Sequence, residues 1–191
     1  MDEKAKCLEY NYNNLGMYTC RNWEGSKYGG MNESQNSVVS VIHSPMKGEV
    51  CPLEEVPDPA FAQRFLGDGV AIIPEDSEVC TPAKGKIVSV FETKHAIVFQ
   101  NEQNVRVLLH VGIGSMRLKG KGFEAYVDSG QQVEEGDKLL SLDLRYLAKR
   151  AETLASPLVM TNNRNRYKIR VIAKGHIEVG DPLFEVVEIS A

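Results

Sequence analysis

Short β-rich runs separated by turn residues are the feature that most constrains how this chain can fold. The runs are rich in Val, Ile and Phe, and Gly, Pro, Asn or Asp residues lie between them, a pattern typical of strands joined by tight connections. We expect strands at Val38 to Ile42, Val70 to Ile73, Ile87 to Phe91, His95 to Phe99, Val105 to Val111, Lys138 to Leu142, Tyr167 to Ala173 and Leu183 to Ile189.

Only two segments have helical spacing. Pro59 to Leu66 is long enough for a turn or two of helix. The stretch from Leu144 to Ala151 carries apolar residues along one helix face, and Asp143 is placed to cap it. Many short strands and little helix predict an all-β fold, an antiparallel sandwich or barrel with one or two short helices.

A weak internal repeat supports this fold class. Gly130 to Leu140 and Gly175 to Phe184 share the order glycine, apolar residue, Gly-Asp, apolar residue. Each segment is consistent with a strand, a Gly-Asp turn and a second strand. We therefore expect a duplicated β motif.

The start of the chain differs from the rest. The first 36 residues hold four of the seven tyrosines and the only tryptophan, and they show neither a helical stripe nor a clean alternation. We interpret residues 1–37 as a flexible leader or the remnant of a linker, and residues 38–191 as one domain.

Charge and hydropathy exclude several classes of function. The net charge is −4 with both signs interspersed, whereas nucleic-acid binding calls for a clustered basic face. No apolar run approaches the roughly 20 residues that span a bilayer, so we expect no direct membrane insertion. Met1 to Lys4 lacks the basic end and apolar stretch of a secretory signal, which indicates a cytoplasmic protein.

Two histidines dominate the search for chemistry. The β-rich runs that contain His95 and His110 flank a polar segment, residues 101–104, which we interpret as a four-residue hairpin loop. If Gln100 pairs with Val105, His95 lies directly opposite His110 on one face of the hairpin. The two Cβ atoms would then be roughly 4.5–5.5 Å apart, close enough for both imidazoles to share one small ligand.

The predicted register also defines the surface around the two rings. Ile97, Phe99 and Leu108 would share the face of the histidines, and Gly112 would leave room for a partner to approach. The sequence thus predicts a shallow apolar docking surface.

Nucleophilic phosphoryl transfer suits such a pair. A neutral imidazole is a good nucleophile near pH 7, because its unperturbed pKa is about 6.5. Transfer through a loose transition state needs positioning and hydrogen-bond donors, and the second histidine can be such a donor. The Thr93 hydroxyl is placed to fix the tautomer or orientation of His95.

Two other interpretations of the pair stay open at this point. The histidines could be ordinary core residues whose nitrogens are satisfied. They could also ligate zinc, which needs a third ligand. Neither an H-x-H nor an HExxH motif occurs, and His43 and His176 lie far away in sequence.

From about Ser40 to Glu188 the chain resembles the glucose-type IIA domain of the bacterial phosphoenolpyruvate:sugar phosphotransferase system. The segments that carry the resemblance follow one another in the order of the family. They are Ser44-Pro-Met-Lys-Gly-Glu, Pro52-Leu-Glu-Glu-Val, Gly67-Asp-Gly-Val-Ala-Ile-Ile-Pro, Glu92-Thr-Lys-His-Ala, Leu108-Leu-His-Val-Gly-Ile, Leu118-Lys-Gly-Lys-Gly-Phe, Gly130 to Asp137 and Pro157-Leu-Val-Met-Thr-Asn.

The resemblance implies a compact antiparallel β-sandwich that acts as a phosphotransferase component in sugar uptake. It implies that His110 accepts a phosphoryl group from the phosphocarrier HPr and passes it to a cysteine of a IIB domain. His95 is then the neighbouring stabiliser, Thr93 helps to hold the pair, and Asp68 meets basic residues of the carrier. No metal or cofactor is implied, and the protein is expected in the cytoplasm beside a membrane permease.

One departure from the family pattern lies next to the acceptor. The family usually has Gly-Ile-Asp-Thr here, whereas this chain reads Gly112-Ile113-Gly114-Ser115. Gly114 removes an aspartate near the site, which is expected to weaken carrier docking more than the chemistry.

Two other functions stay open beside phosphoryl transfer. In the first, the unphosphorylated chain is a regulatory module that binds permeases or metabolic enzymes, with zinc held by His95, His110 and a partner carboxylate. A more distant alternative is a metallopeptidase of the lysostaphin type, whose duplicated β architecture is similar but whose H-x-H ligand pair is missing here.

Overall fold

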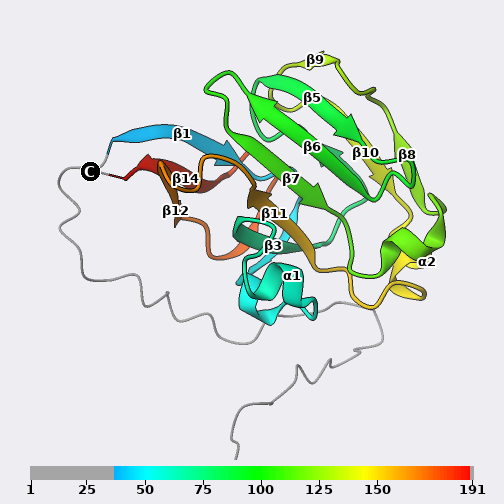
Figure 1. The fold of residues 1–191 in the computed structure, drawn as a ribbon. Helices are drawn as coiled ribbons and strands as arrows, with labels where there is room; N and C mark the ends of the chain where they lie inside the picture. Colours follow the sequence, from blue (N-terminus) through cyan, green and yellow to red (C-terminus); the bar gives the residue numbers. More distant parts are fainter. Residues whose placement is uncertain (1–36, 190–191) are drawn as a thin grey trace, which may run out of the picture.

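The computed structural model describes residues 37–189, and strands dominate this part of the chain (Figure 1). Every strand pair is antiparallel. The largest sheet has eight strands in the described residues. In spatial order they are β13 (Gly175–Ile177), β2 (Gly48–Cys51), β3 (Asp68–Pro74), β11 (Ser156–Met160), β7 (Arg106–His110), β6 (Ala96–Asn101), β5 (Gly85–Val90) and β9 (Gln132–Val133).

Two three-stranded sheets flank the large one (Figure 1). One contains β1 (Val38–His43), β14 (Pro182–Glu188) and β12 (Tyr167–Val171), and the other contains β4 (Glu78–Cys80), β10 (Lys138–Leu142) and β8 (Phe123–Ala125). The helical elements are α1 (Pro59–Ala62), α2 (Leu144–Ala148) and the 3-10 turns η1 (Leu53–Glu55) and η2 (Ser115–Leu118). The predicted all-β sandwich with short helices is confirmed.

Burial explains which strands lie at the centre. β11 is buried along its whole length, and β3 is buried from Gly69 onward, so both faces of these strands are covered. Such strands consist almost wholly of apolar residues, as in Leu158 to Met160. β7, the next strand, alternates instead: Val107 and Leu109 are buried, while Leu108 and His110 are half-buried. His110 is therefore directed away from the core.

The duplicated β motif is also present. In one copy, Ser44 N donates to Asp181 O at 2.7 Å and Gly180 N donates to Ser44 O at 2.9 Å. In the other, Thr81 N donates to Asp137 O at 2.8 Å and Gly136 N donates to Thr81 O at 3.1 Å. Gly136 and Gly180 have left-handed φ values of 82° and 85°, which explains why glycine occurs in both turns.

The strands around these turns correspond as well. β1 and β2 pair with β14 and β13, just as β4 and β5 pair with β10 and β9. Two copies of one arrangement therefore form the frame of the domain, and each copy joins chain segments that are distant in sequence.

Both predicted helices exist, and both are shorter than expected. Asp58 caps α1 by accepting from Ala60 N at 2.8 Å, and the helix stops at Ala62. Arg64 has a left-handed φ of 59°, which is incompatible with a helix that continues to Leu66. Asp143 caps α2 as predicted, accepting from Tyr146 N at 2.9 Å. The predicted leader lies outside the described residues, except for Ser37.

Candidate functional site

His110 is the last residue of β7, half-buried on the outward side of the strand. Across the hairpin it pairs with Ala96, the first residue of β6. Its Nδ1 is buried and has no hydrogen-bond partner among the described residues. The ring is therefore held with one nitrogen inside the protein and one edge toward the surface.

His95 lies beside it, just before β6, in a turn where Lys94 has a left-handed φ of 56°. Its carbonyl accepts from Val111 N at 2.8 Å. The His95 and His110 rings meet edge to face, with centroids 4.8 Å apart and planes inclined by 82°. The structure thus brings the two predicted histidines together.

The predicted register of the hairpin is wrong by one residue. Asn101 N donates to Val105 O at 3.0 Å, which leaves a three-residue loop, 102–104, and pairs Gln100 with Arg106 rather than Val105. Asn104 closes the loop in a left-handed conformation with φ 60°. The rings still meet because His95 precedes the strand, where the alternation of side chains no longer applies.

The register correction changes the surface around the site. Ile97 and Phe99 are 1% and 2% exposed and are part of the core, so neither lines a docking surface as predicted. Gly112 is buried as well, with its N–H 3.2 Å from Ser156 Oγ. Leu108, on the outward side of β7 with His110, is the one of these four that stays partly accessible.

Thr93 contacts the first histidine. Its Oγ1 lies 2.6 Å from His95 Nδ1, so this ring nitrogen has a hydroxyl partner. A hydroxyl that donates to Nδ1 leaves the proton of the neutral ring on Nε2. This contact can therefore set the tautomer of His95.

Both rings are shifted toward the neutral form. Burial lowers the pKa of His95 below its usual value. Burial, together with the neighbouring charge of His95, lowers the pKa of His110 to about 4, although Asp58 and a backbone contact act in the opposite direction. Since imidazole is a nucleophile only when neutral, His110 is ready to react at pH 7.

Two phenylalanines frame the pair, and neither was predicted as a site residue. Phe61 of α1 lies against His110, with ring centroids 5.3 Å apart, and Phe91 lies against His95 at 5.6 Å. The Asp58-Pro59 start of α1 is a recognisable N-cap and first-turn signal, from which the inward face of this helix could have been placed. Nothing comparable marks Phe91.

The acidic residue whose charge acts on His110 is Asp58, whereas Asp68, expected from the resemblance to meet the carrier, has other partners. Among the described carboxylates, that of Asp58 raises the pKa of His110. Asp68 instead contacts Arg64 and accepts from Gly69 N at 2.9 Å, within a polar network after α1. Asp68 is therefore already paired inside the protein, with its side chain 30% exposed.

Gly114 has a φ of 75° and begins η2. A Cβ at this position would lie 2.6 Å from Arg117 Nη2 and 3.1 Å from the side chain of Glu152. These two side chains form an ion pair of 2.7 Å over the glycine. The Arg117–Glu152 pair thus occupies the space that a side chain at position 114, such as the aspartate usual in the family, would need.

The remaining histidines lie elsewhere. His43 Nδ1 lies 3.2 Å from Glu135, and His176 Nε2 lies 2.8 Å from Glu75. No three His, Cys, Asp or Glu side chains within residues 37–189 are grouped so that they could hold a metal ion. A zinc ion at His95 and His110 would thus need a ligand from a partner.

A β-sandwich that presents a neutral histidine at its surface, supported by a second histidine, has the site that a protein needs to carry a group on a ring nitrogen. Residues 40–166 match the model of the family described as phosphoenolpyruvate-dependent sugar phosphotransferase system, EIIA 1. The chain belongs to this family. It is therefore a phosphotransferase component that carries a phosphoryl group in sugar uptake.

Two relatives agree with this assignment. The glucose-specific EIIA component of the phosphotransferase system of Oceanobacillus iheyensis is 38% identical over 149 residues, which cover 78% of this chain and 90% of the relative. The solved structure of glucose permease IIA from Mycoplasma capricolum is 35% identical and has a TM-score of 0.73, covering 82% of this chain and 99% of that chain. In the described residues, no helix is long and apolar enough to span a membrane.

Proposed function

We propose that His110 accepts the phosphoryl group from the phosphocarrier HPr and passes it to a cysteine of a IIB domain. The observation that carries this proposal is a neutral, half-buried ring whose centroid lies 4.8 Å from that of a second histidine. Because Nδ1 of His110 is buried, Nε2 is the nitrogen that a partner can reach. Both relatives are named for glucose, which makes glucose the first sugar system to test.

The relay passes one phosphoryl group through His110 in two successive steps. The bond between His110 Nε2 and phosphorus forms as the bond between phosphorus and the donor breaks. In the second step the phosphorus binds the IIB sulfur as the bond to Nε2 breaks. Little covalent chemistry is left to the protein, so positioning and hydrogen-bond donors decide the rate.

His95 is the proposed donor. When the Thr93 hydroxyl donates to His95 Nδ1, Nε2 carries the proton and can donate it in a hydrogen bond to a phosphoryl oxygen. The ring is 4% exposed, so such a hydrogen bond would form with little competition from water. Thr93 is thus a positioning residue that acts through His95.

Exposed apolar side chains on segments that contact the pair or follow it in sequence are suited to partner docking. Phe91, which packs on His95, is 43% exposed, and Met116, in the turn after Gly114, is 59% exposed. Phe65 is 70% exposed in the loop after α1. Together with Leu108 they form the proposed docking rim, which replaces the set predicted from the sequence.

The cellular setting follows from these partners. Since HPr and IIB domains act at the inner side of the membrane, we place this chain in the cytoplasm, in contact with a sugar permease. Residues 38–191 are proposed to be the phosphoryl-carrying domain, and residues 1–37 a leader or linker.

Phosphorylation in a reconstituted relay tests the proposal. The full chain is incubated with phosphoenolpyruvate, enzyme I and HPr, and the intact mass is followed for the wild type, His110→Ala and His95→Ala. We expect one acid-labile phosphoryl group on the wild type and none on His110→Ala. His95→Ala should accept the group and pass it poorly to a IIB domain.

His176→Ala is the matched control, since this histidine pairs with Glu75 away from the site. It should behave as the wild type. A folded wild type that HPr cannot label would rule out the carrier role for this chain and turn attention to the regulatory alternative.

A further inference from the structure

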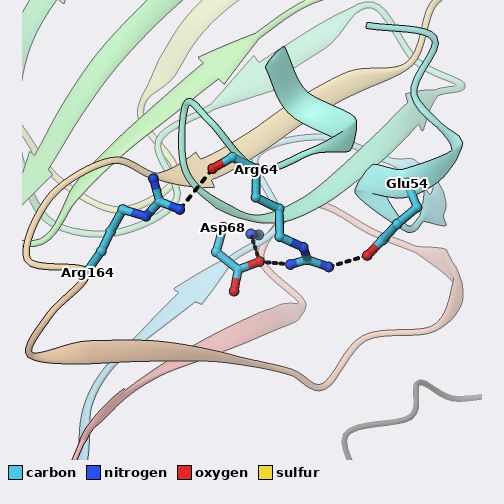
Figure 2. A network of polar contacts seen from close by, with 5 residues as sticks. Glu54, Arg64, Asp68 and Arg164 are labelled. Atoms are coloured by element: carbon cyan, nitrogen blue, oxygen red, sulfur yellow. Dashed lines mark hydrogen bonds and ion pairs between the residues drawn. The ribbon is translucent and has the colours of Figure 1, made fainter. Parts of the chain in front are cut away.

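The segment between β2 and β3 brings Phe61 to His110, although it contains little regular structure. Its helix, α1, has only four residues, and so short a helix is not stable by itself in water. Burial of Leu53, Val56 and Phe61 anchors its inner side. Its outer side is held by polar contacts that centre on Arg64 (Figure 2).

Arg64 joins the two ends of this segment. Its guanidinium lies 2.6 Å from the carboxylate of Glu54, in η1, and also contacts the carboxylate of Asp68, the first residue of β3. Burial, the largest single effect, favours the neutral form of the Glu54 carboxyl, but the hydrogen bond and charge of Arg64 together with a backbone hydrogen bond outweigh it, so the pKa of Glu54 is lowered. One side chain thus ties the residues before and after α1 together.

Arg164 adds a second connection from a different part of the chain. It lies between β11 and β12, and Figure 2 shows its side chain directed to the backbone of the loop after α1. It donates to the carbonyl of Arg64 at 2.9 Å and to that of Phe65 at 3.3 Å. These bonds fix the loop where Arg64 adopts its left-handed φ of 59°.

We propose that Arg64 and Arg164 are positioning residues for phosphoryl transfer. They fix the loop after α1, and through it the packing of Phe61 on His110 and the outward display of Phe65. The proposal rests on the proposed role of His110 as acceptor. Neither arginine needs to touch the phosphoryl group, because the charge of Arg64 is used by Glu54 and Asp68 and Arg164 contacts main-chain oxygens.

Loosening this loop should have two effects. Phe61 would cover His110 less closely, so the ring would be better hydrated. Phe65 would lose its fixed position on the docking rim, so a partner would have to order it on binding. The first effect concerns the free protein, and the second concerns the encounter with the carrier.

The experiment uses the full chain with Arg64→Gln and, separately, Arg164→Gln. An NMR titration of the unphosphorylated protein should show the pKa of His110 rising from about 4 by roughly one unit toward its usual value. In the reconstituted relay, KM for phospho-HPr should rise about five-fold while kcat changes little.

Arg166→Gln is the matched control, because Arg166 pairs with Glu188 at 3.0 Å on the β12–β14 sheet. It should leave both readouts unchanged. If Arg64→Gln does not fold, Arg164→Gln decides, since its partners are surface carbonyls. Wild-type titration and wild-type KM in a folded variant would overturn the positioning role. If the two variants show the expected titration shifts but the wild type accepts no phosphoryl group, only the proposed function is contradicted.

Discussion

The rings of His95 and His110 lie edge to face, with centroids 4.8 Å apart and planes inclined by 82°. Phe61 continues this contact on the side of His110 and Phe91 on the side of His95. Four rings thus form one row, and neither histidine can turn without disturbing an aromatic neighbour. Such a row holds the reactive ring in place before any partner arrives.

His110 should remain neutral well below pH 6. Its pKa is lowered to about 4, chiefly by burial, so an NMR titration of the ring should show no charging between pH 8 and roughly pH 5. A midpoint near 6.5 would show that the ring is not desolvated as described.

The same lowered pKa makes stability depend on pH. The folded state binds a proton less readily than the unfolded state, so the contribution of His110 is fully present above about pH 6.5 and is lost as the pH falls toward 4. The slope is at most about 1.4 kcal/mol per pH unit. Urea unfolding at pH 7, 6 and 5 should show a shallower slope for His110→Gln than for the wild type. Equal slopes for the two proteins would count against the burial of His110.

Replacing Thr93 by Val keeps the shape of the side chain and removes the hydroxyl that contacts His95 Nδ1. The tautomer and orientation of His95 are then less well defined, and transfer to the IIB cysteine should slow by about ten-fold or more. Rapid-quench measurement of phosphoryl transfer checks this. Thr93→Ser keeps the hydroxyl and should retain most of the rate, so equal losses in both variants would exclude the orienting role.

Gly114→Ala should destabilise the protein for two separable reasons, a left-handed φ of 75° and a Cβ placed 2.6 Å from Arg117 Nη2. The backbone strain alone costs about 1 kcal/mol. Gly136→Ala is a matched control, because Gly136 has a φ of 82° and no atom within 4 Å of an added Cβ. Part of the excess loss at Gly114 in urea unfolding should disappear when Arg117→Ala is added, and the Glu152 side chain, 3.1 Å from the added Cβ, accounts for the rest. An excess that Arg117→Ala leaves unchanged would mean that the arginine does not crowd this position.

The duplicated turns predict matched effects at two distant positions. Asp137 accepts from Glu134 N, and Asp181 accepts from Glu178 N, each at 2.8 Å. Asp137→Ala and Asp181→Ala should each cost about 1 kcal/mol in chemical unfolding. A loss confined to one of the two variants would show that the copies are not equivalent in energy.

The strands and the repeat could be predicted because their signals are local. Alternating apolar residues and Gly-Asp turns specify a strand–turn–strand unit with no knowledge of the rest of the chain. The two histidines were found for the same reason, since they lie on consecutive segments of the sequence. The exact pairing of their two strands was not predicted correctly, because the loop length depends on whether Gln100 or Asn101 makes the last pair with the opposite strand.

The rest of the site depends on contacts between distant segments. Phe61 contacts His110, and Asp58 acts on it through its charge, from a one-turn helix and its N-cap. Four strands, β3 to β6, lie between this helix and β7 in the chain. Asp68 was expected at the site from the family resemblance, and its carboxylate contacts Arg64. A local pattern cannot show which of two nearby acids acts on the histidine through its charge.

The paired turns also bear on how the chain folds. Ser44 N donates to Asp181 O, and β1 pairs only with β14 among the described strands. The first described strand therefore cannot pair until the last one is present. Closing so long a loop costs entropy before any contact is gained, which slows folding. During synthesis, β1 stays an unpaired edge until β14 has left the ribosome. This domain should therefore form its frame late and in one cooperative step. Fragments that end before β14 should be bound by chaperones or degraded.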